Sequence, residues 1–599
     1  LAPVVNLARD PRWGRVEETY GEDSWLSAAM GAAFTGSLER NGVVATPKHF
    51  VANHGDGGRD SYPIALDRAT LEDLHFPPFR ASIDRGGARA IMASYNSVNG
   101  VPASASPQLL TGTLRGDWKF GGVVVSDQAG VGGANVLHHT AADYAEATAQ
   151  SISAGLDVIF QSGAHDAALF WPAFRDGRIP RARVDTAVAR VLRLKFTLGL
   201  FEQPYVNPLA EFVRGQTAFG VGPLAARALA EQSAVLLRNE HGMLPLSPSY
   251  RQVALIGPAT LPLGGYTVQP SYLGPVGTGW MEAAHKGEVI RREPGPGIAD
   301  ERWAPVPAAS LWHDGAVGRT TGLRADYHNG AAAEGTPAAS RVEETVDFRW
   351  TFNRPARGIS TDWFAVRLSG GITMPAGAAR ALAVEGDDGY RLWVDDSLVI
   401  DADLKVSYSR RATTHPLAAG DHRIRIEYRK TTLNGRLRLL MEDRGAAARG
   451  DSLIDAAVAL ARSSDVAVVI AGVAEGEFRD RASLHLPGRQ EELIARLADA
   501  GKPVVVVLVA GGAVITTPWM DRVGAVVQMF YPGESGAWAL ARVLHGEVSP
   551  AGRLPYTVPR SEGQLPLVYD HLPTGRGDWY VDLPGEPLFP FGFGLSYTT

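Results

Sequence analysis

The sequence predicts an α/β multidomain protein: a partial (β/α)8, TIM-like barrel, then an α/β sandwich domain with parallel strands that an all-β module interrupts. Three observations predict this arrangement. The chain has 599 residues, which exceeds one hydrophobic core, so several domains are expected. Short apolar runs alternate with amphipathic segments near the start and again near the end. Between these regions the pattern changes to β-type alternation with many turn residues.

The first region, residues 1–206, is the predicted barrel. Alternating β and α segments predict a parallel sheet with crossover helices, in which polar residues directly after each strand face the catalytic end. The region is short against a typical barrel of about 250 residues, and it starts at Leu1 without Met, so we expect a missing N-terminal part. The expected strands are Val43–Thr46, Ala90–Ser94, Gly122–Val125 and Gly155–Phe160, and the expected helices are Leu71–Arg85 and Ala141–Ala154.

The sandwich domain is predicted in two pieces. Residues 207–314 hold a linker, at Asn207–Gly222, and the first piece, and residues 446–599 hold the second. Apolar runs without polar alternation are typical of strands that are buried on both faces. The expected strands are Ala234–Leu237, Val253–Gly257, Asp465–Gly472, Pro503–Leu508 and Gly524–Phe530, with a helix over Gln490–Ala500.

Residues 315–445 are the predicted all-β module. Leu392–Ile400 and His422–Arg429 alternate well, and Asp396-Ser397 is typical of a turn. Asp387-Asp388-Gly389 could bind calcium, but this triplet is also an ordinary turn sequence, which we favour.

Composition narrows the function classes. The net charge of −6 argues against nucleic acid or an anionic membrane as partner. No apolar run reaches the roughly 18 residues of a membrane span. The absence of cysteine excludes disulfides and thiolate metal sites, and no catalytic-metal spacing or Gly-rich phosphate loop occurs. We therefore expect no metal, no cofactor, no nucleic-acid partner and no membrane partner.

Polar residues follow several of the expected strands. Asp127 ends the run that starts at Gly122, where a carboxylate would face a ligand, although Ser126-Asp127 is equally typical of a helix N-cap. Lys48-His49 follows another strand and could bind ligand hydroxyls, or be an ordinary surface pair. Arg15 and Arg59 are further candidates, although arginines beside Gly and Trp are often structural.

The second domain offers an acidic segment. Glu475, Glu477 and Asp480 lie directly beyond the expected strand Asp465–Gly472. Carboxylates beyond a strand end suit a site in a crevice of an α/β domain, although such a run is more commonly a solvated loop.

Taken together, these segments resemble glycoside hydrolase family 3. The similar motifs occur in order and cover most of the chain outside the all-β module, which makes the set specific. They are Arg9–Arg15 with Gly21–Asp23, Lys48–Asn53, Ser94–Pro102, Gly121–Asp127, Gln232–Pro245, Glu475–Arg481 with Leu486–Gly488, and Phe589–Tyr597. The module resembles a protective-antigen-type β module through Gly322–Tyr327 and Asp387–Asp395.

The resemblance implies a retaining exo-glycosidase that releases terminal non-reducing β-D-glucosyl residues by double displacement, without a cofactor, from a carbohydrate or a glycosylated small molecule. It implies that Asp127 is the nucleophile. It also implies that Glu477, three residues before Asp480, is the acid/base, with Glu475 as the alternative. The implied substrate-binding residues are Arg15, Lys48, His49, Arg59 and Tyr95, with Gln128 beside the nucleophile.

Departures from the family pattern leave other functions open. Gln128 stands where the family often has Trp, so a β-xylosidase or arabinofuranosidase stays possible, and Asp56 replaces a frequent Glu. Asp60-Ser61-Tyr62 stands in place of an Asp-Ser-His-like loop, which disfavours an N-acetylglucosaminidase. The family's sugar-binding aspartate lies upstream of Leu1, and its fibronectin-like domain would follow Tyr597. A non-catalytic carbohydrate-binding protein with a degenerate barrel is a further alternative.

Overall fold

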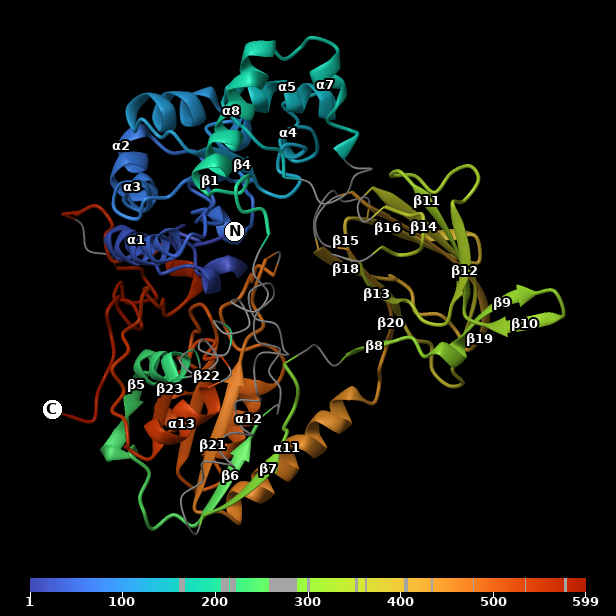
Figure 1. Ribbon diagram of the computed structural model, residues 1–599. Helices are drawn as coiled ribbons and strands as arrows, with labels where there is room; N and C mark the ends of the chain where they lie inside the picture. Colours follow the sequence, from blue (N-terminus) through green and yellow to red (C-terminus); the bar gives the residue numbers. More distant parts are fainter. Residues whose placement is uncertain are drawn as a thin grey trace. The chain divides into compact units, whose positions relative to one another are not determined.

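The computed structural model forms two compact units (Figure 1). The first comprises Leu1–Ile91, Leu192–Asp300 and Ala447–Thr599, and the second comprises Met92–Val191 and Glu301–Ala446. The predicted linker Asn207–Gly222 lies outside the described residues, apart from Gly215 and Gly222. The structure describes residues 1–160, 167–205, 215, 222, 224–257, 288–298, 302–350, 354–360, 363–402, 408–431, 435–477, 479–533, 535–575 and 579–598.

The N-terminal part of the first unit is mostly helical. Helix α1 (Ser24–Arg40) begins at Asp23, whose carboxylate accepts a hydrogen bond from the Leu26 amide, and it packs against α3 (Phe76–Asp84). The predicted helix is present as α2 (Arg68–Thr70), a π-helical turn η3 (Leu71–His75) and α3. The predicted strand Val43–Thr46 is wrong, because this run forms no strand. The chain instead pairs briefly with the N-terminus, through a parallel bridge between Val4 and Lys48.

The corresponding part of the second unit contains the strand that precedes Asp127. Strands β1 (Ala90–Ala93) and β4 (Val123–Ser126) form a two-stranded sheet. The predicted strand Gly155–Phe160 is reduced to a parallel bridge between Val125 and Val158. Sheet pairing among the described residues therefore does not confirm a closed barrel. The remaining elements are the hairpin β2 (Ser97–Val98) and β3 (Val101–Pro102), α4 (Gly133–Val136), α5 (Tyr144–Ala154), which was predicted, α7 (Pro172–Arg175) and α8 (Arg181–Thr197).

A buried carboxylate holds this part together. The Asp157 side chain is fully buried and accepts hydrogen bonds from the Val124 amide at 3.0 Å, Arg115 at 2.7 Å, Arg190 at 2.7 Å and Arg183 at 3.2 Å. The arginines come from η5 (Gln108–Asp117) and α8. Asp157 therefore connects η5 and α8 to β4, and it is the counter-ion of three partly buried guanidinium groups.

We expect Asp157→Asn to lower the free energy of unfolding of this unit by about 3–5 kcal/mol, because it leaves buried arginines without their counter-charge. Urea unfolding followed by circular dichroism measures the change. The matched control is Asp185→Asn, which breaks an exposed pair with Arg181 on α8 and is expected to cost less than about 1 kcal/mol. Equal losses in both variants would contradict a stabilising role of the Asp157 network.

The sandwich domain is built on a six-stranded sheet in its described residues, in the order β5-β23-β22-β21-β6-β7. The central pairs are parallel, as predicted, but β5 runs antiparallel to β23, and β7 was not predicted. The strands are β5 (Val235–Asn239), β6 (Gln252–Ile256), β7 (Val289–Glu293), β21 (Val466–Gly472), β22 (Val504–Val509) and β23 (Ala525–Gln528).

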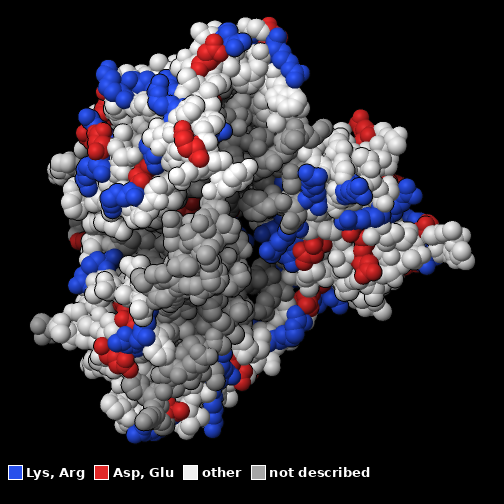
Figure 2. Space-filling model, viewed as in Figure 1, with Lys and Arg blue, Asp and Glu red and all other residues white. Residues whose placement is uncertain are grey.

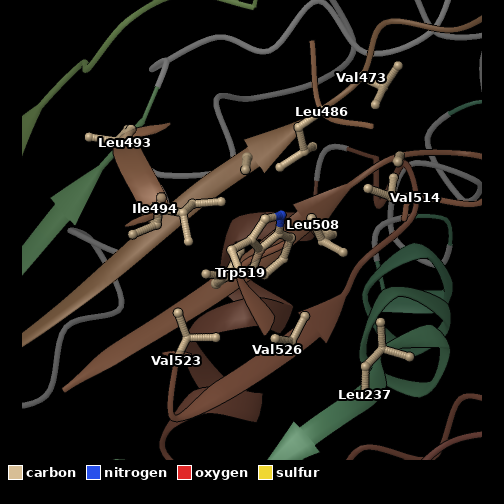
Figure 3. Packing of buried hydrophobic residues seen from close by; sticks show 14 of the residues in the cluster. Leu237, Val473, Leu486, Leu493, Ile494, Leu508, Val514, Trp519, Val523 and Val526 are labelled. Carbon is tan, nitrogen blue, oxygen red and sulfur yellow. The ribbon is translucent and has the colours of Figure 1, made fainter. Parts of the chain in front are cut away.

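Helices cover both faces of this sheet (Figure 1). Alternate residues of the fully buried strand β22 face opposite ways: Val506 and Leu508 pack with α11 (Ala446–Arg462) and α12 (Gln490–Ala498), whereas Val505 and Val507 pack with α13 (Gly536–Leu544). Figure 3 shows the first cluster, with Trp519 among the aliphatic side chains. Burial on both faces explains why β21 and β22 are continuous apolar runs.

The region between the two sandwich pieces is all-β in its described residues. One sheet has eight strands: β9 (Leu311–Gly315), β10 (Gly318–Thr321), β11 (Leu323–Asn329), β12 (Ala339–Glu343), β14 (Phe364–Met374), β16 (Gly389–Val394), β17 (Ser397–Ala402) and β19 (Gly420–Lys430). The other has five: β8 (Trp303–Pro305), β13 (Asp347–Arg349), β15 (Leu382–Asp387), β18 (Tyr408–Ala412) and β20 (Arg436–Glu442). Side chains from both sheets form one core.

Two aspartate pairs of this module lie where one strand ends and the next begins. Asp395 and Asp396 join β16 to β17 with φ of 47° and 62°, one residue earlier than the predicted turn. Asp388, with φ of 64°, is buried, and its carboxylate accepts a hydrogen bond from the Thr431 amide at 2.7 Å. Asp387 ends β15 and Gly389 begins β16, so the triplet predicted as a turn is a one-residue bend between the two sheets.

The last part of the chain packs on its beginning, within the first unit. The buried Glu22 carboxylate accepts hydrogen bonds from the Thr557 amide and hydroxyl at 2.8 and 2.7 Å and from the Tyr569 amide at 3.0 Å. Arg9 pairs with Asp570 at 2.7 Å. These bonds hold the segment from Arg9 to Glu22, which contains Arg15, against the C-terminal part of the sandwich domain.

Acidic and basic side chains are mixed on the described surface. Figure 2 shows acidic and basic side chains interspersed on the face in view, in keeping with the small net charge of −6. Among the described residues, no helix has the length and apolar character needed to span a bilayer.

Candidate active site

A buried arginine is the centre of the site in the first unit. Arg15, only 1% exposed, lies in the 3-10 turn η1 (Gly14–Glu18). Its guanidinium binds Glu18 with two hydrogen bonds of 2.6 and 3.0 Å and donates to Glu477 Oε1 at 2.9 Å. The Arg15 guanidinium therefore pairs with two carboxylates, and its two hydrogen bonds to Glu18 fix its orientation.

His49 contacts the same guanidinium. Its Nε2 lies 2.9 Å from Arg15 Nη2, and its Nδ1 lies 3.0 Å from Asn6 Oδ1. Because arginine can only donate, Nε2 accepts and Nδ1 carries the proton. Burial, with Arg15 and Lys48 nearby, lowers the pKa of His49 well below its usual value. His49 is therefore a neutral imidazole, with the half-buried Lys48 beside it in the chain.

The acidic loop after β21 holds two glutamates in different settings. Glu475 is fully buried and accepts hydrogen bonds from the Gly511 and Gly512 amides at 2.7 and 2.9 Å, while Arg481 pairs with it at 2.7 Å. The Glu477 side chain is 11% exposed and pairs with Arg15. The protein therefore encloses Glu475 and leaves Glu477 in contact with solvent.

Asp480, later in the same loop, forms a second pair of carboxylates with Asp60. Asp480 accepts hydrogen bonds from the Gly14 and Asp60 amides at 2.9 and 2.8 Å, and Trp13 Nε1 donates to Asp60 Oδ1 at 3.0 Å. Asp480 remains exposed at the surface, but desolvation by the surrounding segments, together with the charge of Asp60, raises its pKa to about 6. Burial also raises the pKa of Asp60, against the effect of Arg15.

Asp127 lies in the second unit, directly after β4. Its Oδ1 accepts the Gln128 amide at 2.7 Å, and its carbonyl accepts the Ser126 hydroxyl at 2.7 Å. The helix-cap alternative is not supported, because the next helix, α4, begins at Gly133 and its N-cap is Gly132. The side chain is nearly buried at the end of a strand, where the sequence placed it.

Tyr95 and Gln128 lie together beside Asp127. The buried Tyr95 donates its hydroxyl proton to the Gln128 carbonyl at 2.9 Å. His138 Nε2 lies 2.8 Å from the Tyr95 carbonyl, so this nitrogen carries the proton and donates. His138 was not predicted, because nothing in its sequence context distinguishes it from a surface histidine.

Arg59 belongs to the first unit, but its described contacts do not include Arg15, His49 or Glu477. It is exposed, its guanidinium stacks 5.2 Å from the ring centre of Tyr62, and it donates to the Tyr62 hydroxyl at 3.4 Å. The structure adds Asn6 and Glu18 to the site, and it gives Asp480, already part of the predicted acidic segment, its contacts. Glu18 had a sequence signal, since it lies three residues after Arg15 on a helical turn.

A buried arginine that pairs with Glu477 in the first unit, and a carboxylate directly after a strand in the second, are the kinds of group that a glycoside hydrolase uses. Among the described residues, no group of three or more His, Asp or Glu side chains could hold a metal ion. The chain belongs to glycosyl hydrolase family 3: the family's N-terminal domain matches residues 1–194 and its C-terminal domain matches residues 234–597.

Individual relatives agree with this membership. A β-glucosidase of Rhizobium radiobacter is 33% identical over 647 residues, which cover 100% of this chain and 73% of that protein. A xylan 1,4-β-xylosidase of Xylanibacter ruminicola is 28% identical, covering 100% and 71%. A β-glucosidase structure from Erythrobacter marinus matches with a TM-score of 0.71 and 29% identity, over 100% of this chain. The chain spans 65% of that structure's length, which is less than two thirds.

Proposed function

We propose that the protein hydrolyses terminal non-reducing β-D-glucosyl residues from oligosaccharides or glycosylated small molecules. The observation that carries the proposal is the contrast in the acidic loop of a family 3 chain. Glu475 is enclosed by Arg481 and two backbone amides, whereas Glu477 meets solvent and Arg15. The β-glucosidase names of two similar proteins support glucose as the sugar.

The mechanism we propose is double displacement. Asp127 attacks the anomeric carbon and forms a covalent glycosyl-enzyme, while Glu477 protonates the leaving oxygen. Glu477 then takes a proton from the water that cleaves the intermediate. Arg15, Lys48, His49, Tyr95 and Gln128 bind the sugar. The exposed position of Arg59 gives its proposed binding role no support.

We also propose the domain organisation that the resemblance implies. Residues 1–206 form a partial TIM-like barrel, residues 207–314 and 446–599 form the sandwich domain after a linker, and residues 315–445 are an inserted protective-antigen-type module. The two all-β sheets support the module, although β8 and β9 extend it to Trp303. The family's C-terminal domain model runs across it, which supports an insertion.

A β-xylosidase of the same family is the second candidate. Gln128 and the xylosidase relative favour it. Xylosides lack the hydroxymethyl group of glucosides, so a site that hydrogen-bonds this group rejects them.

A panel of 4-nitrophenyl glycosides tests both candidates. We expect kcat/KM for the β-D-glucoside to exceed that for the β-D-xyloside and the α-L-arabinofuranoside by at least about tenfold. Proton NMR of the first product should show the β-anomer. A reversed order would establish the xylosidase or arabinofuranosidase, and sugar binding without hydrolysis would establish the non-catalytic alternative.

A further inference from the structure

We propose that Asp480 is a positioning residue, whose carboxylate fastens the loop that carries Glu477 to the segment that carries Arg15. In this way it sets where Glu477 delivers its proton. The inference rests on the acid/base role proposed for Glu477. It goes beyond that role because it identifies the residue that holds the Glu477 side chain in position.

The Asp480 carboxylate joins three segments that are far apart in the sequence. Its Oδ1 accepts the Gly14 amide at 2.9 Å, and its Oδ2 accepts the Asp60 amide at 2.8 Å. Gly14 directly precedes Arg15, and Arg15 donates to Glu477 Oε1 at 2.9 Å. Two contacts therefore join the acidic loop to the Arg15 segment: Asp480 binds the Gly14 amide, and Glu477 pairs with Arg15, the next residue in the chain.

Backbone contacts show how closely the loop lies on the Arg15 segment. The Gly476 amide donates to the Gly14 carbonyl at 2.9 Å, and the Arg481 amide donates to the Arg12 carbonyl at 2.8 Å. A Cβ at Gly14 would lie 2.2 Å from the Gly476 carbonyl oxygen. Glycine at position 14 is therefore required for this approach, and any side chain there would push the loop away.

Only an ionised carboxylate suits this junction. Both partners of Asp480 are backbone N–H donors, so both of its oxygens must accept. An amide would turn one acceptor into a donor that faces another donor, which breaks one of the two tethers. Asp60 is itself held by Trp13 Nε1 at 3.0 Å, so its amide is a fixed anchor for the loop.

The test is Asp480→Asn, compared on two substrates. Cellobiose has a poor leaving group that needs the proton of Glu477, whereas 2,4-dinitrophenyl β-D-glucoside does not. We expect kcat/KM to fall about 100-fold on cellobiose, in line with a small misplacement of a catalytic group, and less than about threefold on the activated substrate. The inhibition constant of glucose should stay the same, because ground-state binding does not use the proton.

Two further variants make the outcome decisive. Gly14→Ala pushes the same loop by steric contact and should give the same dependence on the leaving group. Asp465→Asn is the control for loss of the carboxylate charge: Asp465 Oδ2 accepts two backbone amides, of Arg251 and Gln252 at 2.7 and 2.8 Å, at the opposite end of β21. It should leave both rates unchanged.

An equal loss on both substrates in Asp480→Asn would show that the residue only stabilises the fold, and would overturn the proposal. Full cellobiose activity in both Asp480→Asn and Gly14→Ala would also overturn it. The proposed function fails on a different result, namely a Glu477→Ala variant that hydrolyses cellobiose at the wild-type rate.

Discussion

Asp127→Ala is expected to lower kcat by about 10⁴-fold or more, because no other group in the proposed mechanism can form the glycosyl-enzyme. The fold should survive. The hydrogen bond of this carboxylate to the Gln128 amide is local, and the helix that follows does not use Asp127 as its cap. Steady-state kinetics with 4-nitrophenyl β-D-glucoside and a circular dichroism spectrum measure the two properties.

Azide distinguishes loss of the nucleophile from loss of structure. It should restore turnover of Asp127→Ala and give the α-glucosyl azide, the product of a single inversion. Asp176→Ala, which removes an exposed carboxylate paired with Arg178, is the control and should keep wild-type rates. Wild-type rates in Asp127→Ala would refute the assignment of the nucleophile.

Glu477→Ala is expected to lower kcat/KM on cellobiose by about 10²–10⁴-fold, and much less on 2,4-dinitrophenyl β-D-glucoside. The activated leaving group departs without a proton, so only the poor leaving group depends on the acid. Azide should accelerate release of the intermediate and give a β-glucosyl azide, since Asp127 is still present.

Glu475→Gln tests which of the two glutamates, Glu475 or Glu477, is the acid/base. It removes the counter-charge of Arg481 from a fully buried site, so we expect a loss of about 3–5 kcal/mol in the free energy of unfolding. Its rates, measured on the folded fraction, should show no dependence on the leaving group. The reverse pattern, with Glu475 sensitive to the leaving group and Glu477 indifferent, would exchange their roles.

The sandwich domain was predictable because its strands are long apolar runs buried on both faces. The direction of β5 was not predictable, since a short apolar run is compatible with parallel and with antiparallel pairing. Strand β7 was missed because Arg291 and Arg292 follow Val289 and Ile290, a pattern that an edge strand tolerates and a central strand does not. Val43–Thr46 was overestimated, because four residues do not decide between a strand and an extended loop.

The site was predictable to the extent that its residues lie in motifs. Arg15, His49 and Glu477 are together in the first unit, as the family resemblance implied. The partners of His49 and Asp480 were not predictable: Asn6 bonds to His49, and the Gly14 and Asp60 amides bond to Asp480, through contacts between segments that only the fold brings together. Arg59 was expected from the family resemblance alone, and its stacking on Tyr62 shows that chain position does not fix the direction of a long side chain.

The sheet of the sandwich domain has a consequence for synthesis. Gln252 and Asp465 are hydrogen-bonded at its lower edge, although 213 positions separate them in the chain. On the ribosome, β6 therefore emerges long before β21 exists to pair with it, and the whole β module must be translated in between. Such long-range pairing is slow and leaves apolar edges open to aggregation. We therefore expect that β6 is exposed to aggregation during this interval of synthesis.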